Sequence, residues 1–424
     1  MSKKNILVFP CGSEIGLEIY NSLKGSIHFN LIGGSSIADH GKFLFENYIE
    51  TIPFIDDPDF KVKIKQIIVE YKIDLIYPAM DKVIVILKEL EEFIGVPVIG
   101  SPLSTTKICL SKSKTYEVLK DTIDVPFVYK EVGQVSSFPV FLKPDIGYGS
   151  RGVHVIKNQE ELIGLSSTQK DFIVCEYLPG DEFTVDCFTN KVGELLFVGG
   201  RKRKRIVNGI SVNTETDLQL TNEFYRIAQK INDKIVFYGA WFFQLKRRDD
   251  ETPVLLEIAA RLAGSSSVHR IKGVNFAQMS VFQELNFEVD LIENNFNVIL
   301  DRSLSSKFKL SFDYNRVYID FDDTILIDKK INLEAISFIY NCLNNDIKLI
   351  LITKHKGDLF QVLEKYKLNG LFDEVIHLKS TDQKYLFIQP EKSIFIDDSF
   401  SERKEVFKNK NIPVFSIDAL NSLF

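Results

Sequence analysis

Two acidic pairs near the C-terminal end of the chain have the residue types and spacing of a phosphoryl-transfer site. The stretch Asp320-Phe-Asp-Asp-Thr324 follows the apolar run Val317-Tyr-Ile319, and Asp397-Asp398 follows the apolar run Ser393-Ile-Phe-Ile396. Side chains two residues apart on a strand point the same way, so Asp320 and Asp322 are expected side by side at the C-terminal edge of a sheet, where open α/β sheets bind ligands. Carboxylates so placed hold a divalent cation, and one can attack phosphorus while another transfers a proton.

A glycine-rich loop in the middle of the chain has the composition of a phosphate-binding segment. The loop Lys143-Pro-Asp-Ile-Gly-Tyr-Gly-Ser-Arg-Gly152 lies between two strand-like runs. Glycines allow successive backbone N–H groups to turn toward an anion, and Lys143 adds a positive charge. Together with Lys112, this lysine would neutralise the phosphates of one nucleotide. A hairpin loop without a ligand is the alternative for the loop taken alone.

Polar residues on later strands would complete a nucleotide site. Backbone groups of Glu176-Tyr-Leu-Pro-Gly-Asp-Glu182 are suited to read an adenine edge, and Glu182 to accept hydrogen bonds from ribose hydroxyls. Gln244 and Glu257 offer oxygen ligands for magnesium, and Arg261 would stabilise charge on a transferring phosphoryl group. Taken singly, each of these residues has a structural explanation, because buried Glu and Gln side chains often satisfy backbone groups.

The elements that must position these residues alternate between strand and helix at first. Strand-like runs at 5–9, 30–32, 74–77 and 96–99 have helical patterns between them, the first being a helix from about Leu17 after a glycine turn. This alternation predicts a Rossmann-like α/β domain. From about residue 105 the pattern changes to hairpin strands, typical of an α+β region, and a final α/β unit follows the boundary region 299–316.

Composition restricts the class of protein. The chain has 424 residues, 45% of them hydrophobic, and a formal net charge of −6, so we expect no general attraction to nucleic acid or anionic membranes. Its five cysteines form no CxxC pair, which favours reduced thiols and a cytoplasmic location. No run approaches the ~18 apolar residues that a membrane span needs.

The central segments resemble the ATP-grasp superfamily, in the branch like carbamoyl-phosphate synthetase and pyrrolysine-biosynthesis ligases. The resemblance covers about 300 residues and rests on Leu110-Ser-Lys112, Phe138-Pro-Val-Phe-Leu-Lys-Pro144, Gly147-Tyr-Gly-Ser-Arg-Gly152, Glu176 through Asp186, Gln244, and Glu257-Ile-Ala-Ala-Arg261. It implies ATP-dependent phosphorylation of a carboxylate, followed by attack of an amine or similar nucleophile on the acyl phosphate. It also implies cofactors ATP and Mg²⁺, small-molecule carboxylate and amine substrates, and a homodimer, as is common among such enzymes.

The resemblance assigns roles to individual residues. Phosphates would be held by Lys112, Lys143 and the loop residues Gly147, Gly149, Ser150 and Gly152. Adenine would lie against Glu176, Tyr177 and Leu178, ribose against Glu182, metal at Gln244 and Glu257, and the reacting group at Arg261. Two positions depart from the family: Ser111 stands where many members have Asp, and Ala259 where many have Asn. The second departure predicts a less charged metal site.

A run of five basic residues, Arg201-Lys-Arg-Lys-Arg205, is the densest charge cluster. Strand alternation would point Arg201, Arg203 and Arg205 toward the site, where they would bind substrate anions, as a similar segment does in related ligases. A solvated face and nucleic-acid binding are the alternatives. Ser265, in Gly264-Ser-Ser-Ser267, is a further candidate for substrate binding, whereas the nearby His269 is expected to be structural.

The last segment resembles the haloacid dehalogenase-like (HAD-like) superfamily of phosphatases. The four matching elements, in order, are Asp320-Phe-Asp-Asp-Thr324, Thr353 after a strand, Lys384 (or Lys379), and Asp397-Asp398. The resemblance makes Asp320 the nucleophile that forms an aspartyl phosphate and Asp322 the general acid/base. Thr353 and Lys384 would bind phosphate, and Asp320, Asp322, Asp397 and Asp398 would form the magnesium site. The short segments between these motifs predict an uncapped, open site. The expected substrate of the phosphatase is a phosphorylated metabolite.

We therefore predict a multidomain α/β and α+β protein. Its expected parts are a Rossmann-like pre-ATP-grasp domain at 1–103, an ATP-grasp domain at 104–305 and an uncapped HAD-like Rossmannoid domain at 310–424. The expected function is an ADP-forming ligase fused to a phosphatase, acting on small molecules without nucleic acid or membrane. Alternatives are an ATP-grasp kinase or carboxylating enzyme with the same phosphatase, and a regulatory protein that binds nucleotide without turnover.

Overall fold

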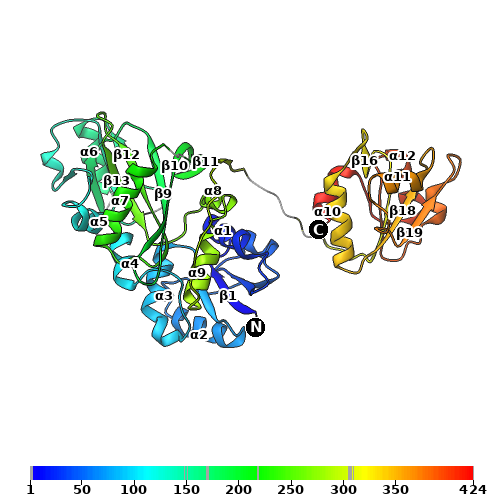
Figure 1. Cartoon of the computed structure of the whole chain (residues 1–424), viewed down its shortest axis with the longest axis horizontal. Coiled ribbons are helices and arrows are strands. Elements are labelled where there is room, and N and C mark those ends of the chain that lie inside the picture. Colours follow the sequence, from blue (N-terminus) through cyan, green and yellow to red (C-terminus); the bar gives the residue numbers. More distant parts are fainter. Residues whose placement is uncertain are drawn as a thin grey trace. The chain divides into compact units, whose positions relative to one another are not determined.

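The chain has a mixed α/β multidomain fold. The computed structural model describes residues 3–147, 149, 151–168, 171–216, 219–303, 308 and 310–423. The chain consists of two compact units, Met1–Leu304 and Ser305–Phe424, each with its own sheets and helices (Figure 1). The prediction of a further domain boundary near residue 103 stays a prediction.

The first unit begins with a parallel four-stranded sheet in the order β3-β2-β1-β4. Its strands are β1 (Lys4–Phe9), β2 (Phe29–Gly34), β3 (Asn47–Ile49) and β4 (Leu75–Pro78). Alternate residues of β1 face opposite sides of the sheet. Ile6 and Val8 pack in one buried cluster with helix α1 (Glu14–Leu23), while Leu7 packs on the other face with α2 (Phe60–Glu70) and α3 (Asp81–Ile94).

Two local predictions in this region were wrong. Helix α1 begins at Glu14 rather than near Leu17, because the side chain of Ser13 accepts a hydrogen bond from the Gly16 N–H at 3.0 Å and caps the helix. The expected strand at 96–99 is reduced to a single parallel bridge between Ile76 and Val98.

Two antiparallel sheets follow in the first unit. One has the order β5-β8-β6-β7 and the other β13-β12-β9-β10-β11-β14. The first consists of β5 (Val128–Tyr129), β6 (Val140–Pro144), β7 (His154–Ile156) and β8 (Phe172–Glu176). The second consists of β9 (Glu182–Thr189), β10 (Leu195–Val207), β11 (Ile210–Thr216), β12 (Gly239–Arg247), β13 (Pro253–Ala259) and β14 (Ile299–Asp301). The hairpin strands expected from alternating sequence all lie within these sheets.

Further helices of the first unit lie between its strands along the chain. They are η1 (His40–Phe43), α4 (Leu103–Leu110), α5 (Lys112–Leu119), η2 (Val132–Gln134), α6 (Gln159–Thr168), α7 (Thr221–Lys234), α8 (Ser267–Ile271) and α9 (Phe276–Glu284). The main cluster places Phe224, Ala228 and Ile231 of α7 against Val185 of β9 and Trp241 of β12. None of the helices in the described part of the chain combines the length and apolar character needed to cross a bilayer.

The second unit is a parallel five-stranded sheet in the order β19-β18-β15-β20-β21 with helices around it (Figure 1). The strands are β15 (Arg316–Ile319), β18 (Lys348–Thr353), β19 (Glu374–His377), β20 (Ser393–Ile396) and β21 (Val414–Phe415). The helices are α10 (Leu333–Asn344), α11 (Leu359–Lys365), η3 (Lys384–Phe387), α12 (Phe400–Lys410) and η4 (Ile417–Ser422). A small hairpin, β16 (Leu326–Ile327) and β17 (Lys330–Ile331), follows the first acidic motif.

The strand order of the second unit brings its two acidic motifs together. The chain moves outward from β15 through β18 to β19, then returns to the opposite side of β15 as β20 and β21. The order therefore reverses between β15 and β20, and open α/β sheets bind ligands beyond the carboxyl ends of the strands at such a point. Asp320 follows β15 and Asp397 follows β20, so the topology brings both acidic motifs to this place.

Candidate active sites

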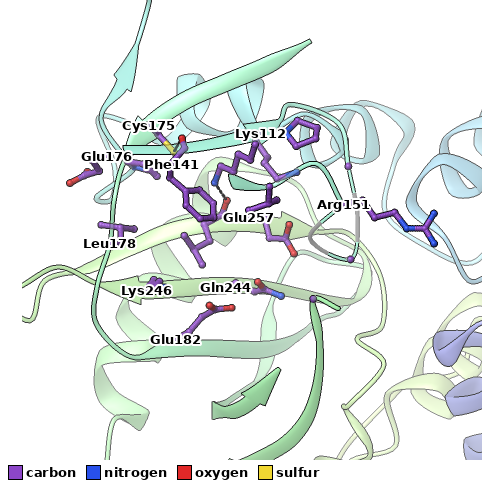
Figure 2. Close-up of a pocket in the computed structure, with 18 of the residues that line it drawn as sticks. Lys112, Phe141, Arg151, Cys175, Glu176, Leu178, Glu182, Gln244, Lys246 and Glu257 are labelled. Atoms are coloured by element: carbon purple, nitrogen blue, oxygen red, sulfur yellow. Dashed lines mark hydrogen bonds between the residues drawn. The ribbon is translucent and has the colours of Figure 1, made fainter. Parts of the chain in front are cut away.

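The first unit contains a pocket between its two antiparallel sheets. Figure 2 shows Glu176 and Leu178 at one end and Lys112 and Arg151 at the other, with Glu257 between them. The residues that line it are Lys112, Pro126, Phe141, Lys143, Pro144, Gly147, Gly149, Arg151, Val153, Cys175, Glu176, Leu178, Glu182, Arg203, Gly209, Gln244, Lys246, Leu256 and Glu257. Residues far apart in the sequence, which were predicted to bind one nucleotide, thus meet in one pocket.

Lys143 is buried at the end of β6, and its ammonium contacts the hydroxyl of a tyrosine on helix α5. Its Nζ lies 2.7 Å from the hydroxyl oxygen of Tyr116, which in turn donates to the carbonyl of Leu256 at 2.5 Å. Burial lowers the pKa of Lys143. Tyr116 was not predicted from the sequence, because no sequence pattern links it to Leu256, which lies more than a hundred residues further along the chain.

Lys112 begins helix α5 beside the strand that carries Lys143. Its Nζ lies 3.4 Å from the carbonyl of Asp145. The Asp145 carboxylate accepts hydrogen bonds from the Ser111 hydroxyl and the Ser113 N–H, each at 2.7 Å. Burial opposes ionisation of Asp145, but these hydrogen bonds outweigh it and lower its pKa. Ser111 also caps α5, so this position ties the helix to the strand end.

The glycine-rich loop approaches the pocket through Gly147, Gly149 and Arg151. Gly149 has a φ of 60° and Gly152 a φ of 71°, in the left-handed region that favours glycine. Gly152 lies between two lining residues, whereas the predicted phosphate contact at Ser150 lies outside the described residues.

At the end of the pocket predicted to hold adenine, the lining residue Glu176 forms an ion pair with Arg248. Glu176 accepts from Arg248 at 2.7 and 3.0 Å and from the Phe127 N–H at 2.9 Å. Burial opposes its ionisation, but Arg248 and the backbone donor lower the pKa of Glu176. Leu178 lines the pocket, while Tyr177 lies with its ring 6.0 Å from the Lys246 ammonium.

Gln244 and Glu257 are direct partners on adjacent strands β12 and β13, and both line the pocket. Side chains that sit opposite each other on adjacent strands point to the same face of the sheet, so the oxygens of Gln244 and Glu257 are suited to bind one cation together. Arg203 also reaches this place: it contacts the Glu182 carboxylate, and its Nη1 lies 3.0 Å from Oε1 of Gln244. Glu182 and Gln244 are therefore joined by a guanidinium.

A second cavity, of about 770 Å³, is lined partly by the same residues and extends to the first sheet. Arg261 lies on its wall and binds Asp81 through two hydrogen bonds of 2.8 and 2.9 Å. Ser265 lines it too and donates to the Ser211 carbonyl at 3.2 Å. The two predicted reactant-binding residues therefore line the same cavity as Gln244 and Glu257.

The basic run does not present its charges to one face as expected. Arg201 is buried against Asp186 at 2.7 Å and lines the larger cavity, but Arg205 is exposed and binds Asp301 at 2.8 Å. The prediction for Arg205 was wrong because the pairing of β10 with β11 shifts register on both sides of this residue. The remaining members are paired as well: Lys202 with Asp181, Arg203 with Glu182, and Lys204 with Glu215.

Asp186 connects the buried Arg201 to His269. His269 is buried with its Nε2 3.1 Å from Oδ2 of Asp186. Burial opposes ionisation of Asp186, but the charge of Arg201 and the hydrogen bond with His269 outweigh it and lower the pKa to about 2. This network anchors helix α8 to the sheet under the larger cavity.

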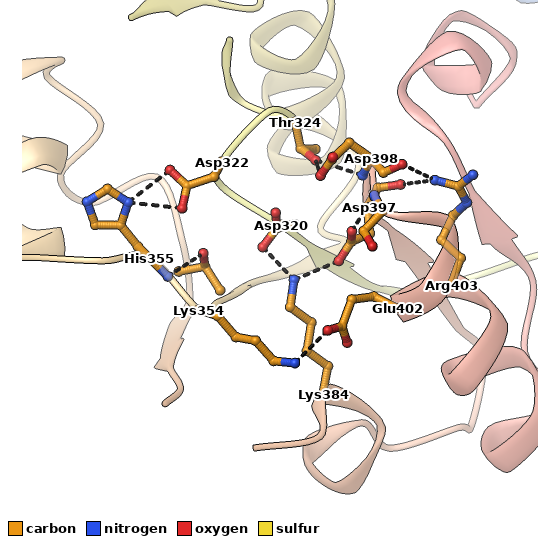
Figure 3. Close-up of polar contacts among 12 residues, drawn as sticks. Asp320, Asp322, Thr324, Lys354, His355, Lys384, Asp397, Asp398, Glu402 and Arg403 are labelled. Carbon is orange, nitrogen blue, oxygen red and sulfur yellow. Dashed lines mark hydrogen bonds and ion pairs between the residues drawn. The ribbon is translucent and has the colours of Figure 1, made fainter. Parts of the chain in front are cut away.

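In the second unit, Lys384 lies between two of the predicted acidic ligands. Its Nζ donates to Asp320 and to Asp397, each at 2.6 Å (Figure 3). Burial raises the pKa of Asp320 to about 7, and the negative charge of Asp397 contributes to this increase. The Lys384 ammonium opposes the increase but does not cancel it. Burial disfavours the Lys384 ammonium, but the two carboxylates outweigh it and raise the pKa of Lys384. The alternative lysine, Lys379, is exposed.

Asp320, Asp397 and Asp398 form a group that fits a metal ion. One oxygen from each lies within 4.8 Å of the others, with Asp320 and Asp397 buried and Asp398 exposed. Thr324 accepts from the Asp398 N–H at 3.1 Å, and the Ser399 N–H donates to Asp397 at 2.8 Å. Hard oxygen donors of this kind suit Mg²⁺, so the donor set fits the ion that the sequence implied.

Asp322 does not belong to this group of three and has a partner that sequence reasoning missed. His355 Nδ1 lies 2.9 and 3.0 Å from the two carboxylate oxygens of Asp322 (Figure 3). Thr353, buried at the end of β18, accepts from the His355 N–H at 3.2 Å. A polar residue just past a strand that ends in the site was the signal that could have identified His355.

Comparison with known proteins supports an ATP-grasp relationship for the middle of the chain. A family model described as "ATP-grasp in the biosynthetic pathway with Ter operon" matches residues 168–300. D-alanine–D-alanine ligase of Thermotoga maritima is 33% identical over 130 residues, which is 28% of this chain and 42% of that protein. The enzyme of the same name from Fusobacterium nucleatum is 26% identical over 151 residues, 34% of this chain and 52% of that protein. The chain thus spans about half or less of these relatives.

Solved structures show a similar fold over a longer stretch. The biotin carboxylase domain of Hydrogenobacter thermophilus 2-oxoglutarate carboxylase, a dimer in complex with MgADP, ADP and bicarbonate, has a TM-score of 0.61 at 16% identity and covers 70% of this chain and 74% of its own. Bacillus licheniformis L-amino acid ligase has a TM-score of 0.53 at 18% identity and covers 69% and 76%. Because the second unit is less than a third of the chain, this shared fold must include more than half of the first unit.

Proposed function

We propose that the first unit is an ADP-forming ligase that joins a carboxylate to an amine or thiol. One observation carries this proposal: Lys112, Lys143, Gln244 and Glu257 line one pocket, at the edge of a larger cavity that also holds Arg261. The ATP-grasp match at 168–300 and the ligases among its relatives support the same chemistry. The reactants of D-alanine–D-alanine ligases and of the L-amino acid ligase make amino acids the first substrates to test.

In this proposal ATP lies with its adenine near Leu178 and its phosphates near Lys112 and Lys143. Glu257 and Gln244 would hold Mg²⁺, which would neutralise phosphate charge. A carboxylate oxygen of the substrate, placed in the larger cavity near Arg261, attacks the γ-phosphorus, and the bond to the β-phosphate oxygen breaks to release ADP. The nucleophile then attacks the acyl carbon, loses a proton and expels inorganic phosphate.

We infer that the second unit is a phosphatase of the HAD-like type. The buried group Asp320, Lys384 and Asp397 at the switch point of a parallel sheet supports this assignment. Asp320 would attack phosphorus while Asp322 gives a proton to the departing alcohol. Asp322 would then take a proton from the water that hydrolyses the aspartyl phosphate. Lys384 and Thr353 would bind the phosphate oxygens.

The ligase proposal is tested by ADP release from the Asp320→Asn variant, in which the phosphatase background is removed. Pools of amino acids and small carboxylates are supplied with ATP, Mg²⁺ and hydroxylamine, which converts an acyl phosphate to a hydroxamate. ADP together with hydroxamate in one pool is the expected result. ADP without hydroxamate would favour a kinase or carboxylating enzyme. Nucleotide binding with no ADP from any pool would contradict the ligase and favour the regulatory function.

A further inference from the structure

Arg203 is held in the nucleotide pocket as a bound cation would be. Its guanidinium contacts three oxygens: the Glu182 carboxylate, Oε1 of Gln244 at 3.0 Å, and the carbonyl of Gly209 at 2.8 Å. The Arg203 side chain is only 7% exposed. Its charge cannot be removed at ordinary pH, because a guanidinium is not deprotonated in proteins.

This arrangement leaves few anionic ligands for metal ions. Of the glutamates that line the described part of the pocket, Glu176 is paired with Arg248 and Glu182 with Arg203, which leaves Glu257. Among the described residues, the group of three acidic, His or Cys side chains close enough to share one ion is Asp320, Asp397 and Asp398, which does not line this pocket. Gln244 is neutral, and one of its lone pairs already faces Arg203.

A second divalent ion at this place would meet a fixed positive charge. Two cations a few ångströms apart repel strongly in a site that is partly shielded from water. Mg²⁺ needs about six oxygen ligands, usually including one or two carboxylates. The guanidinium uses the carboxylate of Glu182 and part of Gln244, so it both repels a second ion and occupies the oxygens that would bind it.

We propose that Arg203 takes the place of a second divalent ion, so that ATP binds this pocket with one Mg²⁺, held at Glu257 and Gln244. This inference rests on the proposed nucleotide site. Arg203 thereby supplies permanent positive charge between Glu182 and Gln244, and the charge does not depend on the concentration of free metal. A lone carboxylate with one amide is then a sufficient metal site.

The test counts the metal ions that enter with the nucleotide. The full chain is kept in excess over a non-hydrolysable ATP analogue, so that nearly all nucleotide is bound, and bound Mn²⁺ is measured by equilibrium dialysis with and without the analogue. The difference excludes ions at the second unit. We expect one added Mn²⁺ per nucleotide in the unmodified chain and two in Arg203→Gln, where Glu182 and Gln244 are released.

Arg205→Gln is the matched control, because Arg205 lies on the same strand but is exposed and paired with Asp301. We expect one added Mn²⁺ per nucleotide in this variant. Two added ions in the unmodified chain, or one in a nucleotide-binding Arg203→Gln variant, would overturn the inference while leaving the nucleotide site intact. Failure of the unmodified chain to bind the analogue would overturn the nucleotide site and this inference with it. If Arg203→Gln does not fold, the count in the unmodified chain decides alone.

Discussion

Lys384 donates a 2.6 Å hydrogen bond to Asp320 in the interior of the second unit, where both side chains are less than a tenth exposed. Asp397 shares the same ammonium. Buried charges are tolerated when they are paired, and removing one partner leaves the others uncompensated. In the proposed phosphatase site, this lysine would have two roles: it would keep the two carboxylates together before a metal ion binds, and it would place a positive charge next to the phosphoryl group of the substrate.

Replacing Lys384 by Met should destabilise the second unit when metal is absent. The expected loss in unfolding free energy is about 3 kcal/mol, because two buried carboxylates lose their counter-charge. Mg²⁺ should recover part of this loss, since an ion that binds only the folded state stabilises it. Urea unfolding in EDTA and in Mg²⁺ measures both effects, with Lys379→Met, an exposed lysine, as control. Equal stability of the two variants in EDTA would contradict this account.

His355 should position the carboxylate of Asp322. His355→Leu removes the donor that contacts both Asp322 oxygens, and we expect kcat for p-nitrophenyl phosphate to fall roughly 10- to 100-fold, as for other groups that orient a reacting residue. His355→Asn keeps an N–H donor and should retain more of kcat. Similar kcat values in the two variants would show that the hydrogen bond to Asp322 has no such role.

Tyr116 should orient Lys143 toward the nucleotide. Tyr116→Phe removes the hydroxyl that lies 2.7 Å from the ammonium, and the loss of such a bond is worth about 1 kcal/mol, or roughly fivefold in affinity. We expect the Kd of an ATP analogue to rise by that factor, as measured by calorimetry. Tyr225→Phe, at an exposed tyrosine, is the control. An unchanged Kd in Tyr116→Phe would remove this residue from the site.

The pairing of Asp186 with Arg201 should stabilise the first unit at neutral pH and not in strong acid. The pKa of Asp186 is about 2 when folded against an ordinary value of 3.8. A depressed carboxyl pKa gives stability that is fully present above the unfolded value and is lost as pH falls toward the folded value. The shift corresponds to roughly 2 kcal/mol.

Asp186→Asn should therefore lower the unfolding free energy by at least about 2 kcal/mol at pH 7. The difference from the unmodified chain should shrink as pH decreases below about 4, because the unfolded carboxyl then becomes protonated. Thermal unfolding from pH 7 to pH 3 measures this trend. A difference that stays constant or grows on acidification would contradict the assigned pairing.

Much of the fold follows from local sequence signals. The apolar runs at 317–319 and 393–396 became central strands, and the acidic residues after them meet because parallel strands end at the same edge. Alternation in 182–188 and 194–198 correctly indicated antiparallel strands. These features depend on side-chain periodicity, which the sequence displays directly.

The details that the sequence did not reveal depend on partners far along the chain. Arg203 meets Gln244, and Tyr116 meets Leu256, only through tertiary packing. The misplacement of Arg205 has a similar cause, since an irregular pairing of β10 with β11 reverses the facing that strict alternation implies. Residue type and spacing indicated the pockets, but not which charges within them are already neutralised.

We propose that one chain carries two separate phosphoryl-transfer sites, one in each unit. The most direct measurement compares two activities, ADP formation with the productive substrate pool and hydrolysis of p-nitrophenyl phosphate, in Lys143→Met and Asp320→Asn. We predict a reciprocal result: Lys143→Met loses ADP formation and keeps hydrolysis, while Asp320→Asn loses hydrolysis and keeps ADP formation. Loss of both activities in either correctly folded variant, or loss of neither, would contradict two independent sites.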